Sequence, residues 1–174
     1  MSQDAPIAVI GFAYRAPGVG GKGLWDYLSQ AKSAWSKIPA DRFNQDAYCR
    51  TGPEKSGVFR VQGGHFVPGD IYAFDAAFFN MRAEEAKNAD PQQRMLLEVA
   101  LESAEMAGHS LNSLAGQKIG VFIGSGQHEY SACLTDDNFS VKTFTATGLA
   151  PCMLANNGAF AACPNRLRGS IRRL

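Results

Sequence analysis

Continuous apolar runs and helical periodicity follow one another along this chain. Residues 6–12 (PIAVIGF) and 118–126 (KIGVFIGSG) are rich in β-branched side chains, a pattern typical of strands buried on both faces of a sheet. Apolar side chains between them recur at a helical spacing over residues 90–107. Two buried strands that flank one long helix predict a right-handed crossover and a parallel sheet, and hence an α/β fold.

The long helix carries its own start and stop signals. Asp90 is a good N-cap, Pro91 suits the first helical position, and Gln93 is placed to close a capping box. Gly108 is predicted to end the helix in a left-handed conformation. The predicted buried stripe is Leu97, Ala100, Leu101 and Ala104, and the predicted solvent face is Glu98, Glu102 and Glu105.

The remaining segments have weaker patterns. Residues 24–34 show a helical spacing of apolar side chains, and residues 38–70 combine turn formers with aromatics, which indicates an ordered excursion of short elements. The phenylalanines of residues 71–81 predict core packing rather than chemistry. A short apolar segment is predicted to be helical from Leu149 onwards.

Charge and hydropathy narrow the classes of partner. The 174 residues are consistent with one domain, and the formal net charge of +1 gives no field that would attract nucleic acid or an anionic membrane. No apolar run approaches the ~18 residues of a membrane span, and the N-terminus has no basic region followed by an apolar stretch. We therefore expect a soluble, cytoplasmic protein.

The cysteines and hydroxyls do not form a recognisable reactive motif. The four cysteines lack a CxxC pair, which argues against a zinc site or a redox motif and favours reduced, mostly buried thiols. Cys163 precedes a proline that breaks any helix able to lower the pKa of its thiol. Ser125 lacks the GxSxG spacing of a nucleophile elbow. The other cysteines are Cys49, Cys133 and Cys152.

The remaining candidate binding residues are the glycines of a GxGxxG pattern, the histidines and a C-terminal group of arginines, and each has a structural explanation that needs no ligand. Gly18, Gly20 and Gly23 satisfy GxGxxG before a predicted helix, but residues 13–17 separate them from the strand, and the P-loop pattern fails. Nucleotide binding is a minor alternative. The three histidines are expected to be structural, and the arginines near the C-terminus are expected to belong to a frayed tail. These residues are His65, His109 and His128, and Arg166, Arg168, Arg172 and Arg173.

An ordered series of motifs resembles the N-terminal part of ketosynthase domains in type I polyketide synthases, particularly the iterative fungal kind. The series covers about residues 5–157. It runs PIAVIG, LWDYL, DRFN, GGHF, FDAAFF, DPQQRMLLEVALESAEMAG, GVFIGSG, ATG and PCMLAN. The resemblance implies a partial thiolase-like fold that comprises most of its first αβα half. A fatty acid synthase origin is an alternative, and DRFN and GGHF favour the polyketide synthases.

The resemblance also implies a chemistry that this chain does not complete. Ketosynthases use a cysteine thiolate and two histidines for decarboxylative condensation, with acyl units carried on the phosphopantetheine of an acyl carrier domain, and they usually form homodimers. The family's Thr-Ala-Cys-Ser-Ser element is expected after Asn156, and the histidines later still. No catalytic, cofactor-binding or metal-binding residue is therefore assigned, and we expect the chain to be inactive alone.

The chain departs from the family pattern at identifiable positions. Asn80 begins a four-residue stretch that replaces the common Gly-Ile-Ser-Pro, Ala89 replaces a methionine, and Asn157 replaces an arginine. We predict a ketosynthase portion over residues 1–157 and a divergent basic tail over residues 158–174. The alternative to an inactive truncated fragment is an interaction fragment that pairs with an intact ketosynthase. Uncovered strands predict poor solubility or a molten state for the isolated chain.

Overall fold

The structure is a computed structural model that describes residues 6–19, 23–48, 60–126, 129–134 and 142–162. These residues form two compact units, which are considered separately. The first contains residues 6–13 and everything described from Ile71 onwards, and the second contains Tyr14–Asp70. None of the helices in these ranges is long and apolar enough to cross a membrane.

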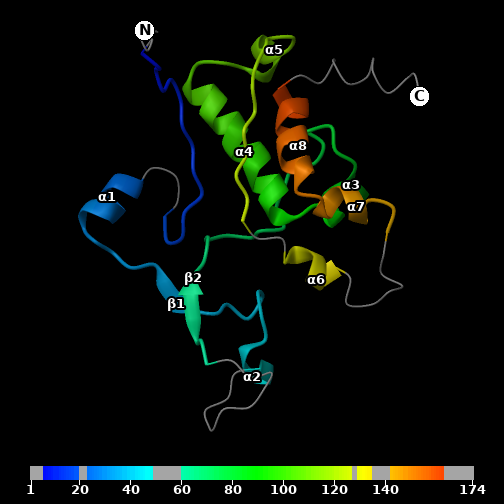
Figure 1. The fold of residues 1–174 in the computed structure, drawn as a ribbon. Helices are drawn as coiled ribbons and strands as arrows, with labels where there is room; N and C mark the ends of the chain where they lie inside the picture. Colours follow the sequence, from blue (N-terminus) through cyan, green and yellow to red (C-terminus); the bar gives the residue numbers. More distant parts are fainter. Residues whose placement is uncertain (1–5, 20–22, 49–59, 127–128, 135–141, 163–174) are drawn as a thin grey trace, which may run out of the picture. The chain divides into compact units, whose positions relative to one another are not determined.

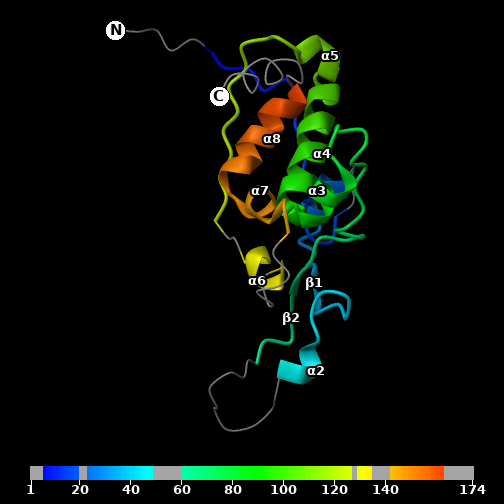
Figure 2. The ribbon, with the colours of Figure 1, turned by 90° about the vertical axis from the view of Figure 1, so that its right-hand side faces the viewer.

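The first unit is built around one long helix (Figure 1). Helix α4 packs against α8, and α3 packs against α7, as both views show (Figure 2). The unit has few fully buried apolar side chains, among them Ala89 and Leu97. Its helices are α3 (Ala83–Asn88), α4 (Pro91–Met106), α5 (Leu111–Leu114), α6 (Tyr130–Leu134), α7 (Thr145–Leu149) and α8 (Cys152–Ala162).

The predicted ends of α4 are confirmed, with one correction at its start. The Asp90 carboxylate accepts a hydrogen bond from the Gln92 backbone N–H (2.8 Å), and Pro91 is the first helical residue. Gln93 does not close a capping box, because the Asp90 N–H donates instead to the Gly148 carbonyl (2.9 Å). The orphan donor at the cap is thus satisfied by α7, which leaves the Gln93 amide for other partners.

The C-terminus of α4 has the geometry of a Schellman motif. Gly108 has φ +78°, and its N–H donates to the Glu105 carbonyl, while the His109 N–H donates to the Ala104 carbonyl. The predicted left-handed stop at Gly108 is therefore confirmed. The predicted stripe is only partly buried, since Leu97 is buried and Ala100 is exposed.

The two predicted buried strands are extended, but they are not paired. Within the described residues, 6–13 and 118–126 belong to no strand ladder. Most of their apolar side chains are exposed, including Ile7 and Phe122. The parallel pairing predicted for them is absent from the described part of the chain, because a ladder needs neighbouring strands that these residues do not supply.

The second unit confirms an excursion of short elements. Strands β1 (Trp35–Lys37) and β2 (Gly63–His65) pair antiparallel, with Trp35 opposite His65. A Cβ atom at Gly63 would overlap the Ser36 carbonyl oxygen and lie 2.6 Å from the Trp35 ring, so only glycine fits there. The unit also contains helices α1 (Leu24–Ser29) and α2 (Gln45–Tyr48).

Helix α1 is shorter than predicted. It ends at Ser29 rather than near residue 34, because Gln30 caps it and Ala31 adopts a positive φ of 47°. Its apolar face is also less buried than its spacing suggested, since Leu28 is exposed. Short helices depend on packing against other apolar surface for their stability, and this six-residue helix buries none of its residues, which limits its length.

Candidate functional site

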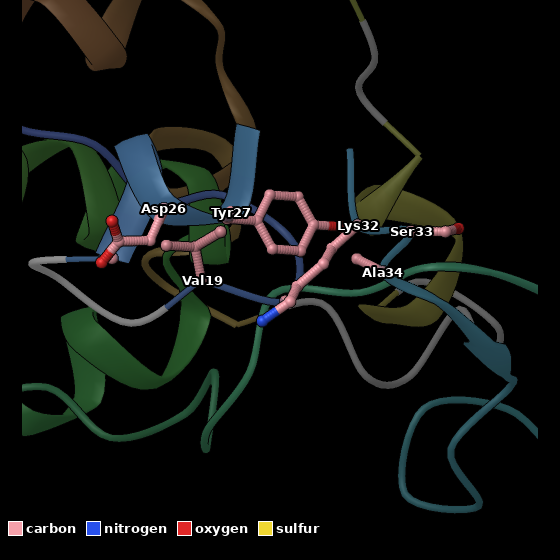
Figure 3. Close-up of a pocket in the computed structure, with 8 residues that line it drawn as sticks. Val19, Asp26, Tyr27, Lys32, Ser33 and Ala34 are labelled. Atoms are coloured by element: carbon pink, nitrogen blue, oxygen red, sulfur yellow. The ribbon is translucent and has the colours of Figure 1, made fainter. Parts of the chain in front are cut away.

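The described part of the second unit contains an open cavity of about 470 Å³ (Figure 3). Val19, Tyr27 and Ala34 give it an apolar wall, and Figure 3 shows the Tyr27 ring among the lining side chains. Asp26 and Lys32 lie at its exposed rim and form no ion pair with each other in the described residues. The cavity therefore offers an apolar surface and exposed charges of both signs.

The cavity does not contain a catalytic arrangement. Its remaining lining residues are Gly18, Gly23 and Ser33, so no histidine or cysteine among the described residues reaches it. Nucleophilic or acid–base chemistry needs a nucleophile within hydrogen-bond reach of a base, and among the described residues Ser33 makes no hydrogen bond with Asp26 or Lys32. The geometry supports at most the burial of a small apolar group.

The glycines of the GxGxxG pattern have local structural explanations. Gly18 has φ +72°, and a Cβ atom there would lie 2.6 Å from the Ala34 Cβ, so the fold itself requires glycine. Gly23 has a negative φ at the start of the six-residue α1, and Gly20 lies outside the described residues. The geometry of Gly18 therefore needs no nucleotide to account for it.

The other candidate side chains are dispersed. His65 is an exposed residue of β2, and His109 is exposed just after α4, while His128 lies outside the described residues. Ser125 donates a hydrogen bond to the Gln92 side-chain oxygen (3.2 Å), and within the described part of the chain its hydroxyl bonds to no histidine or carboxylate. No group of three metal-ligating side chains occurs among the residues that the structure describes.

The cysteines follow the same pattern as far as they are described. Cys152 is the first residue of α8, and its thiol is free, as predicted, and exposed, although most of the thiols were expected to be buried. The sequence did not predict this exposure, because the residues next to Cys152 are apolar and such segments are usually buried. Cys49, Cys163 and the side chain of Cys133 lie outside the described residues, as does the predicted basic cluster of residues 166–173.

A hydrogen-bonded polar site of the first unit joins α4, α7 and α8, and its residues were not predicted from the sequence. Gln93 is only 3% exposed, and its side-chain N–H groups donate to the carbonyls of Thr147 (3.3 Å) and Gly148 (2.8 Å). Its side-chain oxygen accepts from the Asn157 amide (2.9 Å). We call Asn88, Asp90, Gln93, Gly148 and Asn157 the polar junction.

Close backbone packing completes the polar junction. A Cβ atom at Gly148 would overlap the Asn88 carbonyl oxygen and lie 3.1 Å from the Ala89 nitrogen. The Asn88 side chain is buried and donates to the Glu84 carbonyl. The available sequence signal was Gln93, which lies four residues before Leu97 and hence on the same buried face of α4.

A buried arginine lies beside this junction. Arg94 is buried, and its guanidinium donates to the Tyr72 carbonyl (3.2 Å) and lies 5.6 Å from the centre of the Tyr72 ring. Two of its nitrogens, Nε and one Nη, have no hydrogen-bond partner among the described residues. These contacts tie α4 to the aromatic segment 71–81. Phe74 and Phe79 stack on each other there and are half-buried, whereas Phe78 is exposed, so the predicted core packing is only partly seen.

The family is decided by a match along most of the sequence. Residues 4–164 match the family model described as the β-ketoacyl synthase, N-terminal domain. The chain belongs to this family. The polar junction falls inside the matched residues, as do the two unpaired apolar stretches, residues 6–13 and 118–126, which we call the extended segments.

Curated relatives of this β-ketoacyl synthase chain are much longer proteins. It is 67% identical to the highly reducing polyketide synthase Preu5 of Preussia isomera, over 89% of this chain and 6% of the relative. It is 61% identical to the highly reducing polyketide synthase ACRTS2 of Alternaria alternata, over 90% of this chain and 6% of that relative. The predicted resemblance to fungal polyketide synthases is confirmed.

Solved structures confirm the predicted thiolase-like fold class. The chain superposes on the oxazolomycin ketosynthase domain OzmH KS7 of Streptomyces albus JA3453 with a TM-score of 0.74 and 24% identity, covering 88% of this chain and 27% of that one. For the ketosynthase from module 6 of the bacillaene synthase of Bacillus subtilis 168, the TM-score is 0.63 at 29% identity, with 82% and 24% covered. The chain thus spans about a quarter of these ketosynthase chains.

Proposed function

We propose that this chain is a noncatalytic first portion of a ketosynthase domain from a highly reducing fungal polyketide synthase. The observation that carries the proposal is its 67% identity to such a synthase over 89% of the chain. The noncatalytic part rests on the expectation that the family's nucleophilic cysteine and histidines match no residue of this chain. The relatives favour a polyketide synthase over a fatty acid synthase.

The chemistry of a complete ketosynthase domain needs three reacting side chains. A cysteine thiolate takes an acyl group from a phosphopantetheine thioester on the carrier domain. A malonyl thioester then loses CO2, and the resulting carbanion attacks the acyl carbonyl and releases the thiolate. Two histidines assist these steps by binding the developing negative charge. We propose that residues 6–157 contribute to the scaffold of this site and supply no reacting atom. The proposed location is the cytoplasm, and no metal is assigned.

An acylation assay tests the noncatalytic proposal. The purified chain is incubated with an acyl thioester and a malonyl-charged carrier protein, and mass spectrometry follows all four cysteines. We expect no acyl-enzyme, no CO2 release and no condensation product, whereas an intact ketosynthase domain assayed in parallel gives all three. An acyl group on one cysteine together with a condensation product would contradict the proposal.

Transcript sequencing tests the proposed boundary near residue 157. Sequencing the cDNA from the Met153 codon onwards shows whether the ketosynthase pattern resumes downstream, in another reading frame or after an intron. A transcript that continues to a Thr-Ala-Cys-Ser-Ser sequence would contradict the noncatalytic proposal. A transcript in which the pattern does not resume supports it.

A further inference from the structure

We draw no further inference here: the strongest candidate, the open cavity beside α1 in the second unit that Val19, Tyr27 and Ala34 line, carries no proposal, because nothing in the structure shows what covers its apolar wall.

Discussion

The polar junction and the extended segments reverse the usual distribution of side chains. At the junction, Gln93 and Asp90 are buried and hydrogen-bonded, whereas Ile7, Val9 and Phe122 in the extended segments are exposed. Both regions lie in the same unit. The two regions differ in whether their interaction partners are present. The junction residues hydrogen-bond to other residues of this chain, whereas in the described residues no strand pairs with the apolar segments and their side chains stay exposed.

The polar junction is held together by hydrogen bonds and not by the burial of apolar side chains. A buried amide is stable only when its donors and acceptors are paired, and Gln93 achieves this with carbonyls of α7 and the Asn157 side chain. Apolar strands need a second layer and a ladder. The variants below test this contrast, in order of decreasing expected effect.

Gly148→Val should disrupt the polar junction most severely. Its side chain would overlap the Asn88 backbone, which cannot move aside as a flexible side chain would. We expect the free energy of local opening of α4 to fall by about 3 kcal/mol or more. Amide hydrogen exchange of α4 measures this. Gly124→Val is the control, because a Cβ atom there meets nothing within 4 Å. Equal protection of α4 in both variants would contradict the assigned packing.

Gln93→Leu should have the next largest effect. The substitution leaves the Asn157 amide without its Gln93 acceptor and removes the side-chain donor to the Thr147 carbonyl, while the Gly148 carbonyl keeps the Asp90 N–H, at a cost of about 2 to 3 kcal/mol. Faster amide exchange at the start of α4 and in α8 is the expected observation. Gln117→Leu is the matched control at an exposed position after α5. If both variants exchange alike, Gln93 does not join the helices.

Gly108→Ala should weaken only the end of α4. The left-handed conformation of Gly108 costs a side chain about 1 kcal/mol, although no atom stands within 4 Å of the new Cβ. Exchange should accelerate in the last turn of α4 and remain unchanged at the polar junction. Gly124→Ala, at a position with ordinary φ, serves as the comparison. Acceleration spread along all of α4 would show that the cap and the junction are not independent.

Phe122→Lys should have the smallest effect on the isolated chain. Because Phe122 is exposed, the substitution should change stability by at most about 0.5 kcal/mol while removing an apolar contact for self-association. We expect light scattering to show less aggregation and α4 exchange to stay the same. A loss of α4 protection would mean that Phe122 supports the first unit already.

A monodisperse wild-type monomer with one sharp thermal transition would contradict the predicted poor solubility.

Local signals in the sequence were sufficient where a few neighbouring residues determine the geometry. The Asp90 cap and the Gly108 stop were predicted because the chemistry of a helix end is contained in adjacent residues. The backbone conformation at Asn80 is also explained by the residue itself, at a position where this sequence departs from the family pattern. It has φ +53° at the position where the family commonly has glycine, and asparagine tolerates this conformation better than most residues.

Contacts between distant residues were not predictable in the same way. Nothing near Gln93 in the sequence indicates that its amide bonds to Gly148 and Asn157, more than 50 residues away. The glycine at position 148 likewise has an ordinary local pattern, and only the approach of the Asn88 carbonyl explains it. Such contacts depend on the packing of helices, which no short window of sequence contains.

By itself, the sequence determined the family, the start and end of α4, and the extended, apolar character of residues 6–12 and 118–126, because caps, glycine stops and β-branched runs act over a few residues. Only the tertiary structure decided which helices meet through Gln93 and that the two apolar segments stand unpaired in the described residues. The physical reason is that hydrogen-bond partners and covering layers are supplied by residues remote in sequence, so local propensity specifies a strand but not its neighbours.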